Sequence, residues 1–245
     1  MSQSSSKIGK SILYALGLCA WTFLALEISS FVFAYLLYFI LGAETLTTPL
    51  WTTIYHSLMY IGAFALIAIV PYKLFKKFQA KRPTRNSLGL KSTPTWIDLG
   101  LAPVGFIVYL IGAALLTWLF SLFPWFNADQ VQDVGYSTYL AGGDLIIAFI
   151  ALVLIAPIAE ELIFRGYLYG KLRGQLKLGA LAATIIVSLL FALLHGQWNV
   201  AVNVFALSCV LCTLREITGT IYSGILLHMI KNGIAFYFLY IAHSS

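Results

Sequence analysis

The sequence predicts an all-α protein in which about seven transmembrane helices pack into one bundle. Of the 245 residues, 60% are hydrophobic and only 10% are charged, and the mean hydropathy is +0.90. A soluble domain carries about 25% charged residues, so this chain cannot cover a globular surface with charge. The apolar runs are continuous and do not alternate with polar residues, which indicates membrane helices rather than strands. We therefore expect residues 1–245 to form a single membrane-embedded domain.

Each expected helix is a run of roughly 20 apolar residues, because a helix rises about 1.5 Å per residue across the bilayer. The first run follows the polar and basic start MSQSSSKIGK and is too long for a cleavable signal, so we interpret it as a retained span. The first and fourth runs are long enough to tilt or protrude, and the sixth is short. The predicted helices cover residues 11–41, 51–72, 99–123, 145–172, 178–195, 200–214 and 219–241.

Basic residues gather on one side of the predicted bundle if the seven helices alternate in direction. Of the 15 Lys and Arg residues, 13 precede the first helix or follow the second, fourth and sixth, and the loops GAETLTTPL and FNADQVQD contain none. Positively charged loops stay in the cytoplasm. We therefore expect a cytoplasmic N-terminus in a bacterial plasma membrane, with membrane lipid as a partner. The net charge of +6 is then a topology signal and does not indicate nucleic-acid binding.

Polar groups on three of the helices lie at similar depths. Glu160 lies about 18 Å from the expected cytoplasmic end of the fourth helix, and His195 lies about 25 Å along the fifth. In the seventh helix, His228 and Asn232 lie about 14 Å and about 20 Å from the start. Ionisable groups at such depths are costly in lipid and usually face a cavity or one another. We expect these four side chains to meet in a polar cavity.

The adjacent residues Glu160 and Glu161 have different predicted roles. Neighbours on a helix point about 100° apart, so both cannot face the cavity squarely. Glu161 and Arg165 are spaced i,i+4 with the acid first, which is the favourable order for an ion pair, and we interpret this pair as structural. Glu160 has no local partner, and an unpaired carboxylate in an apolar setting is a better proton acceptor near neutral pH. Glu160 is therefore our candidate general base.

The stretches FALLH and HMIKN supply groups that can stabilise developing negative charge. Phe191 and His195 share a helix face, as do His228 and Asn232, because each pair is spaced i,i+4. An imidazole or carboxamide donor aimed at an oxygen that becomes negative supplies about 2.7–4 kcal/mol of transition-state stabilisation. A base, a water site and convergent donors are the parts needed for attack on a peptide carbonyl.

The stretches EELIFR, FALLH and HMIKN resemble the signatures EExxxR, FxxxH and HxxxN of the CPBP family of intramembrane proteases. This family includes the type II CAAX prenyl endopeptidases, the Abi proteins and the lysostaphin-resistance-like membrane proteins. The resemblance implies a catalytic core at residues 145–241, preceded by variable helices at residues 1–123. It implies an endopeptidase that cuts a peptide or lipidated protein near the membrane–cytoplasm boundary, with its cavity opening toward the cytoplasm.

By this resemblance, Glu160 activates a water molecule with help from His195, and His228 and Asn232 stabilise the oxyanion. The residues expected to support the shape of the site are Glu161, Arg165 and Phe191. The family favours a mechanism without metal, and the HExxH motif of soluble zinc proteases is absent. No cofactor is therefore our preferred prediction. Zinc is the alternative, held by Glu160, His195 and His228 with a water as fourth ligand.

Lys231 departs from the family pattern, in which the residue before the motif asparagine is usually apolar or small. This cation could favour the ionised form of Glu160, pair with Glu27 of the first helix, or bind a substrate carboxylate. It also favours a second class of function, a non-catalytic protein for bacteriocin immunity or peptide binding in the same fold. A small proton-coupled transporter is a third class, but no internal repeat or pair of broken helices supports it.

Overall fold

Long apolar helices dominate the computed structural model, as the continuous hydrophobic runs predict. The structure describes residues 2–74, 82–128, 134–136 and 140–242. Within these residues the regular elements are all helices, so the predicted all-α fold class is confirmed.

Six of the helices in the described part of the chain are long and apolar enough to cross a membrane, and a seventh apolar helix is shorter. The six candidate spans are Ser11–Leu41, Pro49–Lys73, Trp96–Ser121, Gly142–Gly174, Trp198–Thr218 and Tyr222–Ile241. The shorter helix is Ala180–Leu193. Each of the seven corresponds to one predicted run.

The chain visits its helical segments in a simple order, and three of the segments, labelled η, are π-helical. The segments are α1 (Ser2–Leu41), α2 (Ala43–Leu46), α3 (Pro49–Leu74), α4 (Trp96–Ser121), α5 (Gly142–Phe149), η2 (Ile150–Ile155), α6 (Ala156–Glu161), η3 (Leu162–Tyr169), α7 (Gly170–Gly174), α8 (Ala180–Leu193), α9 (Trp198–Thr218), α10 (Tyr222–Phe236) and η4 (Tyr237–Ile241). The segments from α5 to α7 follow one another without a break and form one long helix, Gly142–Gly174.

The prediction that the sixth helix is short is wrong. Helix α9 has 21 residues, whereas α8, the fifth, has only 14. The apolar run stops at Leu214, but α9 continues through Arg215 and Glu216 until Gly219 ends it in the left-handed conformation, with φ 68°. Helix α8 ends early, and Gly196 follows it with φ 67°. Glycine adopts such angles at little cost because it has no Cβ, and so it commonly follows the last turn of a helix.

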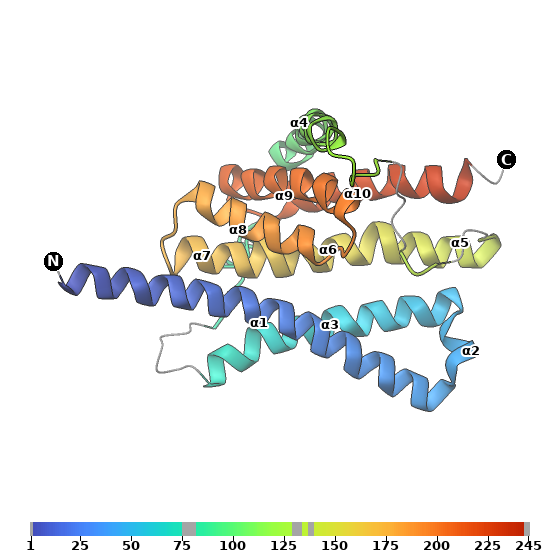
Figure 1. Cartoon of the computed structure of the whole chain (residues 1–245). Helices are drawn as coiled ribbons and strands as arrows, with labels where there is room; N and C mark the ends of the chain where they lie inside the picture. The colour runs from blue at the N-terminus through green and yellow to red at the C-terminus, as the bar shows by residue number, and fades with distance from the viewer. Residues whose placement is uncertain (1, 75–81, 129–133, 137–139, 243–245) are drawn as a thin grey trace.

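The helices lie in layers (Figure 1), and the long helix Gly142–Gly174 occupies the middle one. On one side it contacts α1 and α3, and on the other it contacts α8, α9 and α10. Helix α4 lies outside this second group, packed against α9 and α10. Side chains near the centre of the long helix are therefore enclosed from both sides.

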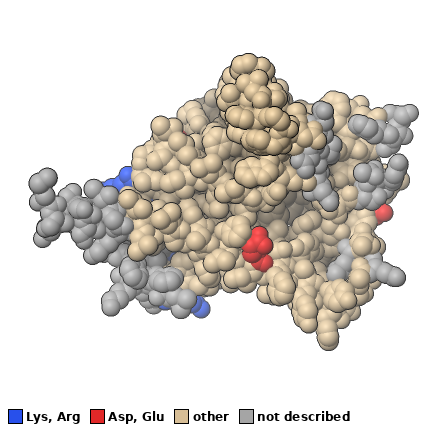
Figure 2. Space-filling view, in the orientation of Figure 1, with Lys and Arg blue, Asp and Glu red and all other residues tan. Residues whose placement is uncertain are grey.

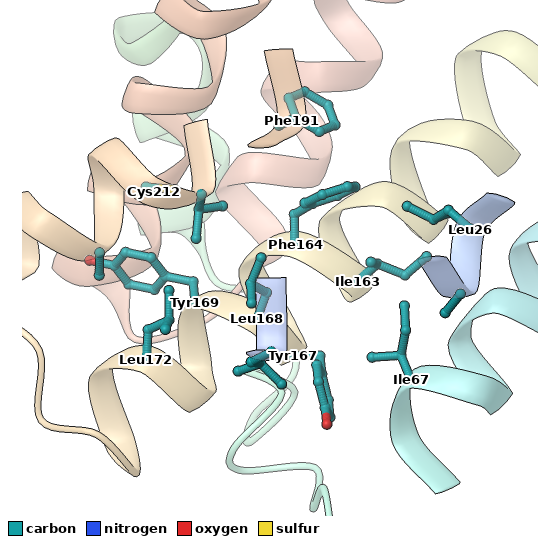
Figure 3. Packing of buried hydrophobic residues seen from close by; sticks show 14 of the residues in the cluster. Leu26, Ile67, Ile163, Phe164, Tyr167, Leu168, Tyr169, Leu172, Phe191 and Cys212 are labelled. Carbon is teal, nitrogen blue, oxygen red and sulfur yellow. The ribbon is translucent and has the colours of Figure 1, made fainter. Parts of the chain in front are cut away.

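The largest hydrophobic cluster surrounds η3, within the long helix. Ile163 and Phe164 are at most 2% exposed. They pack in one cluster with Ile67 of α3 and Phe191 of α8, as Figure 3 shows. This cluster joins the layers directly after the two glutamates of α6, and it holds that part of the long helix in a fixed rotation.

Candidate active site

The two glutamates lie in a short α-helical segment between two π-helical ones. The segment α6, Ala156–Glu161, follows η2 and precedes η3. π-helical turns are rare, and they occur frequently at functional sites. Glu160 and Glu161 thus lie where the helix departs from regular α geometry, which sequence periodicity did not indicate.

Glu161 and Arg165 form the ion pair that their spacing predicts. Arg165 Nη1 donates to Glu161 Oε1 at 2.9 Å, and both side chains are fully buried. Arg165 Nη2 also donates to Ser208 Oγ of α9 at 2.7 Å. The guanidinium carbon lies 4.5 Å from the ring centroid of Phe191, close enough for a cation–π contact. This buried charge therefore ties the long helix to α8 and α9.

His228 joins the two glutamates. Its Nδ1 lies 3.1 Å from Glu161 Oε1, and its Nε2 lies 3.7 Å from Glu160 Oε2. A carboxylate only accepts hydrogen bonds, so Nδ1 carries the hydrogen toward Glu161. Nε2 can then donate only when the ring is doubly protonated, which the two neighbouring carboxylates favour.

Glu160 has a partner that sequence analysis missed. The hydroxyl of Tyr60 in α3 donates to Glu160 Oε1 at 2.6 Å. Glu160 therefore lacks a local partner, as predicted, but it is bound by a residue 100 positions earlier in the chain. No motif surrounds Tyr60. The one available signal was a hydroxyl group in the middle of an apolar span, where polar atoms usually find a partner inside the bundle.

His195 lies just beyond the C-terminal end of α8. Its Nδ1 is 2.8 Å from the backbone carbonyl oxygen of Phe191, and its ring packs edge-on against the Phe191 ring at 4.9 Å. Because a carbonyl can only accept, Nδ1 carries the hydrogen, and Nε2 is left with a free lone pair. His195 is thus oriented as a proton acceptor.

Asn232 binds the long helix. Its Nδ2 donates to the backbone carbonyl oxygen of Leu152 at 2.8 Å. A carboxamide has two N–H donors and a carbonyl oxygen. One donor is used in this contact between helices, and the second is the group that the predicted oxyanion role requires.

The four residues predicted to meet do line one cavity of about 720 Å³. Glu160 and His228 face each other there, while His195 and Asn232 lie on the same wall surface without a direct hydrogen bond to Glu160. The cavity is also lined by residues outside the three motifs, namely His56, Tyr60 and Lys231. Sequence analysis assigned His56 no role because it belongs to no motif.

The cavity lies toward one end of the bundle. Its lining includes Gly135 from the connection between α4 and α5, Leu152 from the first half of the long helix, and Tyr240 of η4. The basic residues Lys171 and Arg173 lie in α7, at the opposite end of the same long helix. The Lys and Arg atoms visible in Figure 2 also lie at that end, where Figure 1 shows the N-terminus.

This placement argues against the predicted cytoplasmic opening of the cavity. Basic loops mark the cytoplasmic side, and the cavity extends toward the other end of the helices. Residues 75–81, which contain several of the predicted basic positions, lie outside the described part of the chain. The depths estimated from sequence placed the polar groups correctly near mid-span, but they contained no information on the direction in which the cavity widens.

The zinc alternative requires three ligands that converge on one point. Among the described residues, no group of three His, Cys, Asp or Glu side chains is placed to hold a metal ion. His228 Nδ1 is directed at Glu161 and His195 Nδ1 at a backbone carbonyl, so each imidazole has only Nε2 left for a metal. In this arrangement Glu160, His195 and His228 do not fit a zinc site, and no step of the reaction below uses one.

Comparisons with known proteins point to one family. Residues 142–234 match the family model described as type II CAAX prenyl endopeptidase Rce1-like. The chain is also 23% identical over 185 residues to the membrane-embedded CAAX protease MroQ of Staphylococcus aureus strain USA300, a match that covers 72% of each chain. No solved structure matches. The matched segment contains all three motifs and the four residues around the cavity, and the chain therefore belongs to the CPBP family of intramembrane proteases.

Proposed function

We propose that the protein is an intramembrane endopeptidase in which Glu160 activates the attacking water. The observation that carries this proposal is the contrast between the two adjacent glutamates. Glu161 is fully buried in an ion pair with Arg165, whereas Glu160 lines the cavity and contacts no Lys or Arg within 4.0 Å. A carboxylate that faces space for a water molecule is available as a base, and a carboxylate held by a guanidinium is not.

The reaction follows from the orientation of these groups. Glu160 takes a proton from a water molecule, and the water oxygen bonds to the carbonyl carbon of the peptide. Nε2 of protonated His228 and the second N–H of Asn232 donate to the oxyanion that forms. When the carbon–nitrogen bond breaks, the leaving amine takes the proton from Glu160. His195 assists through Nε2, whose lone pair can accept a hydrogen bond from the water.

The substrate is a peptide or a lipidated protein, as for the family, and it enters from the membrane side that the cavity faces. Because the basic loops occupy the other end, we place this opening on the extracytoplasmic side. A thiol at Val134, which lines the cavity, tests this placement. In a variant that retains none of the natural cysteines, an impermeant thiol reagent added to intact cells is expected to label Val134→Cys but not Lys91→Cys. The reverse pattern would restore the cytoplasmic opening.

Glu160→Gln tests the catalytic role of the carboxylate without changing its shape. We expect the cleavage rate to fall by about 10²–10⁴, the usual contribution of general acid–base catalysis. Cleavage of a prenylated CAAX peptide by protein in nanodiscs is one readout. Comparison of the peptides in cells that carry the variant or the unaltered protein is a readout that assumes no substrate. Asp144→Asn, on the same long helix but exposed, is the matched control. Undiminished cleavage by well-expressed Glu160→Gln would remove the proposal.

Metal dependence is measured on the purified protein. We expect no stoichiometric zinc and no effect of chelators on cleavage. Zinc that is lost together with activity on chelation would replace the proposed base with a metal-bound water.

A non-catalytic peptide-binding or immunity function is the second candidate. It is favoured by Lys231 in the cavity and by the use of one Asn232 donor for packing. Under that alternative, Glu160→Ala keeps the full biological function. Under the proteolytic function, the same variant loses it.

A further inference from the structure

Lys231 occupies an unfavourable position for a cation. It is the tenth residue of the twenty-residue span Tyr222–Ile241, so it lies near the middle of the membrane and far from both surfaces. A lysine at the centre of a membrane helix is costly, and such residues usually face a partner or a water-filled cavity. Lys231 is half-buried and directed toward a cavity.

The described part of the chain offers this ammonium group no partner. It forms no hydrogen bond there, and no described carboxylate lies within 4.0 Å of it. Glu160 in the same cavity already contacts Tyr60 through one oxygen and His228 through the other. The pairing with Glu27 that the sequence left open is not formed, because Glu27 is exposed on α1.

Arg165 shows what a satisfied cation looks like in this bundle. It is fully buried, and it is held by Glu161, Ser208 and the ring of Phe191. Lys231 has none of these features, although it lies in the same C-terminal half of the chain. The contrast indicates that the counter-charge for Lys231 comes from outside the protein.

Lys231 also lies where two cavities meet. It lines the active-site cavity and a second cavity of about 670 Å³ between α4 and α9, whose wall includes Tyr109, Thr117 and Asn203. Of the residues that line them, only Lys231 and Val204 are common to both cavities. A ligand in the active-site cavity can therefore reach the ammonium group while a peptide bond lies at Glu160.

We propose that Lys231 is an anion-binding subsite that receives a carboxylate of the bound peptide. This inference rests on the proposed function, since it assumes that a peptide occupies the cavity. The carboxylate is either the C-terminus of the peptide or an Asp or Glu side chain close to the bond that is cut. Pairing in this setting is strong, because a charge-assisted hydrogen bond is about twice as strong as a neutral one. Lys231 thus selects substrates that have a negative charge near the cleavage position.

Binding measurements on the Glu160→Gln protein test the subsite without cleavage. Three N-dodecanoyl tetrapeptides serve as probes for the full chain in nanodiscs: a free C-terminal acid, the corresponding neutral amide, and an amide with one internal Asp. We expect at least one of the two acidic probes to bind about tenfold more tightly than the neutral amide, which corresponds to about 1.4 kcal/mol. Preference for the first acidic probe alone identifies the C-terminus as the ligand, and preference for the second identifies a side chain.

Variants of the lysine complete the test. Lys231→Met is expected to abolish the preference, Lys231→Arg to keep it, and Lys91→Met, at an exposed position, to leave it unchanged. Equal affinity for all three probes, including no binding of any, contradicts the proposal even if Lys231→Met does not fold. A preference that survives in folded Lys231→Met also contradicts it. None of these outcomes depends on catalysis, so the subsite can fail while Glu160-dependent cleavage by the unaltered protein stands, and the reverse.

Discussion

The pair formed by α1 and α3 differs from the C-terminal bundle in how its polar groups are used. Between α1 and α3, isolated hydrogen bonds accompany apolar packing, as where Ser29 Oγ donates to the carbonyl of Met59 at 2.8 Å. In the bundle, Glu161, Arg165 and His228 form a connected network of buried ionisable groups. The cost of burying charge is therefore concentrated around α6, beside the cavity.

This difference separates helices that surround the site from helices that contain its chemistry. The family match begins at residue 142, after α1, α3 and α4 have ended. Even so, α3 supplies the hydroxyl that binds the candidate base and the imidazole of His56 at the cavity wall. The N-terminal pair is thus a scaffold that also reaches into the site. The predictions below test that division.

Breaking the charged network is expected to have the largest effect. Arg165→Met leaves Glu161 buried without its cation, and loss of one partner of a buried ion pair costs about 3–5 kcal/mol. Equilibrium unfolding in mixed detergent micelles measures the loss. Arg173→Met is the matched control, because Arg173 pairs with Glu216 where both are partly exposed, and such pairs contribute about 0–1 kcal/mol. Equal stability of the two variants would show that the network does not hold the bundle together.

A methyl group at Gly224 is expected to disturb the same network from the opposite helix. A Cβ at this position would lie 3.0 Å from Glu161 Oε2 and 3.5 Å from the side chain of Leu211. Overpacking of this kind costs about 1–3 kcal/mol, so we expect Gly224→Ala to unfold at lower denaturant than the unaltered protein. Gly100→Ala is the control, since nothing lies within 4 Å of its added Cβ. If both alanine variants are equally stable, Glu161 is not closely packed against α10.

Sequence analysis predicted the parts of the molecule that follow from short-range rules. Hydrophobic runs predicted seven helices, and i,i+4 spacing predicted the pair of Glu161 with Arg165. The length of α9 was missed because charged residues end an apolar run before they end a helix. Tyr60 and Ser208 were missed because each contacts the site across a distance in sequence that no periodicity encodes. The direction of the cavity depends on how side chains fill the bundle.

Tyr60→Phe tests the contribution of the N-terminal pair to the reaction. It removes one hydrogen bond to Glu160, and we expect kcat to fall about tenfold, or about 1.4 kcal/mol in the barrier, with little change in KM. Tyr60 is a positioning residue, so the change should appear in kcat and not in stability. Tyr55→Phe is the control, because Tyr55 pairs with Ser30 on the same two helices. A parallel fall in Tyr55→Phe would mean that the helix pair, and not the bond to Glu160, controls the rate.

The smallest expected effect comes from one substitution made in both regions. Ser29→Ala removes an isolated hydrogen bond between α1 and α3, and polar contacts between membrane helices contribute about 0.6 kcal/mol on average. Ser208→Ala removes the same hydroxyl from the network and leaves a guanidinium N–H of Arg165 without its acceptor, which costs about 1–3 kcal/mol. Unfolding of the two variants under identical conditions compares the regions directly. Since the lost group is identical, any excess at Ser208 measures the charge that it serves. Equal losses would mean that the bundle tolerates an unpaired cationic donor, and the case for a charge-dense C-terminal half would then rest on Glu161 and Arg165 alone.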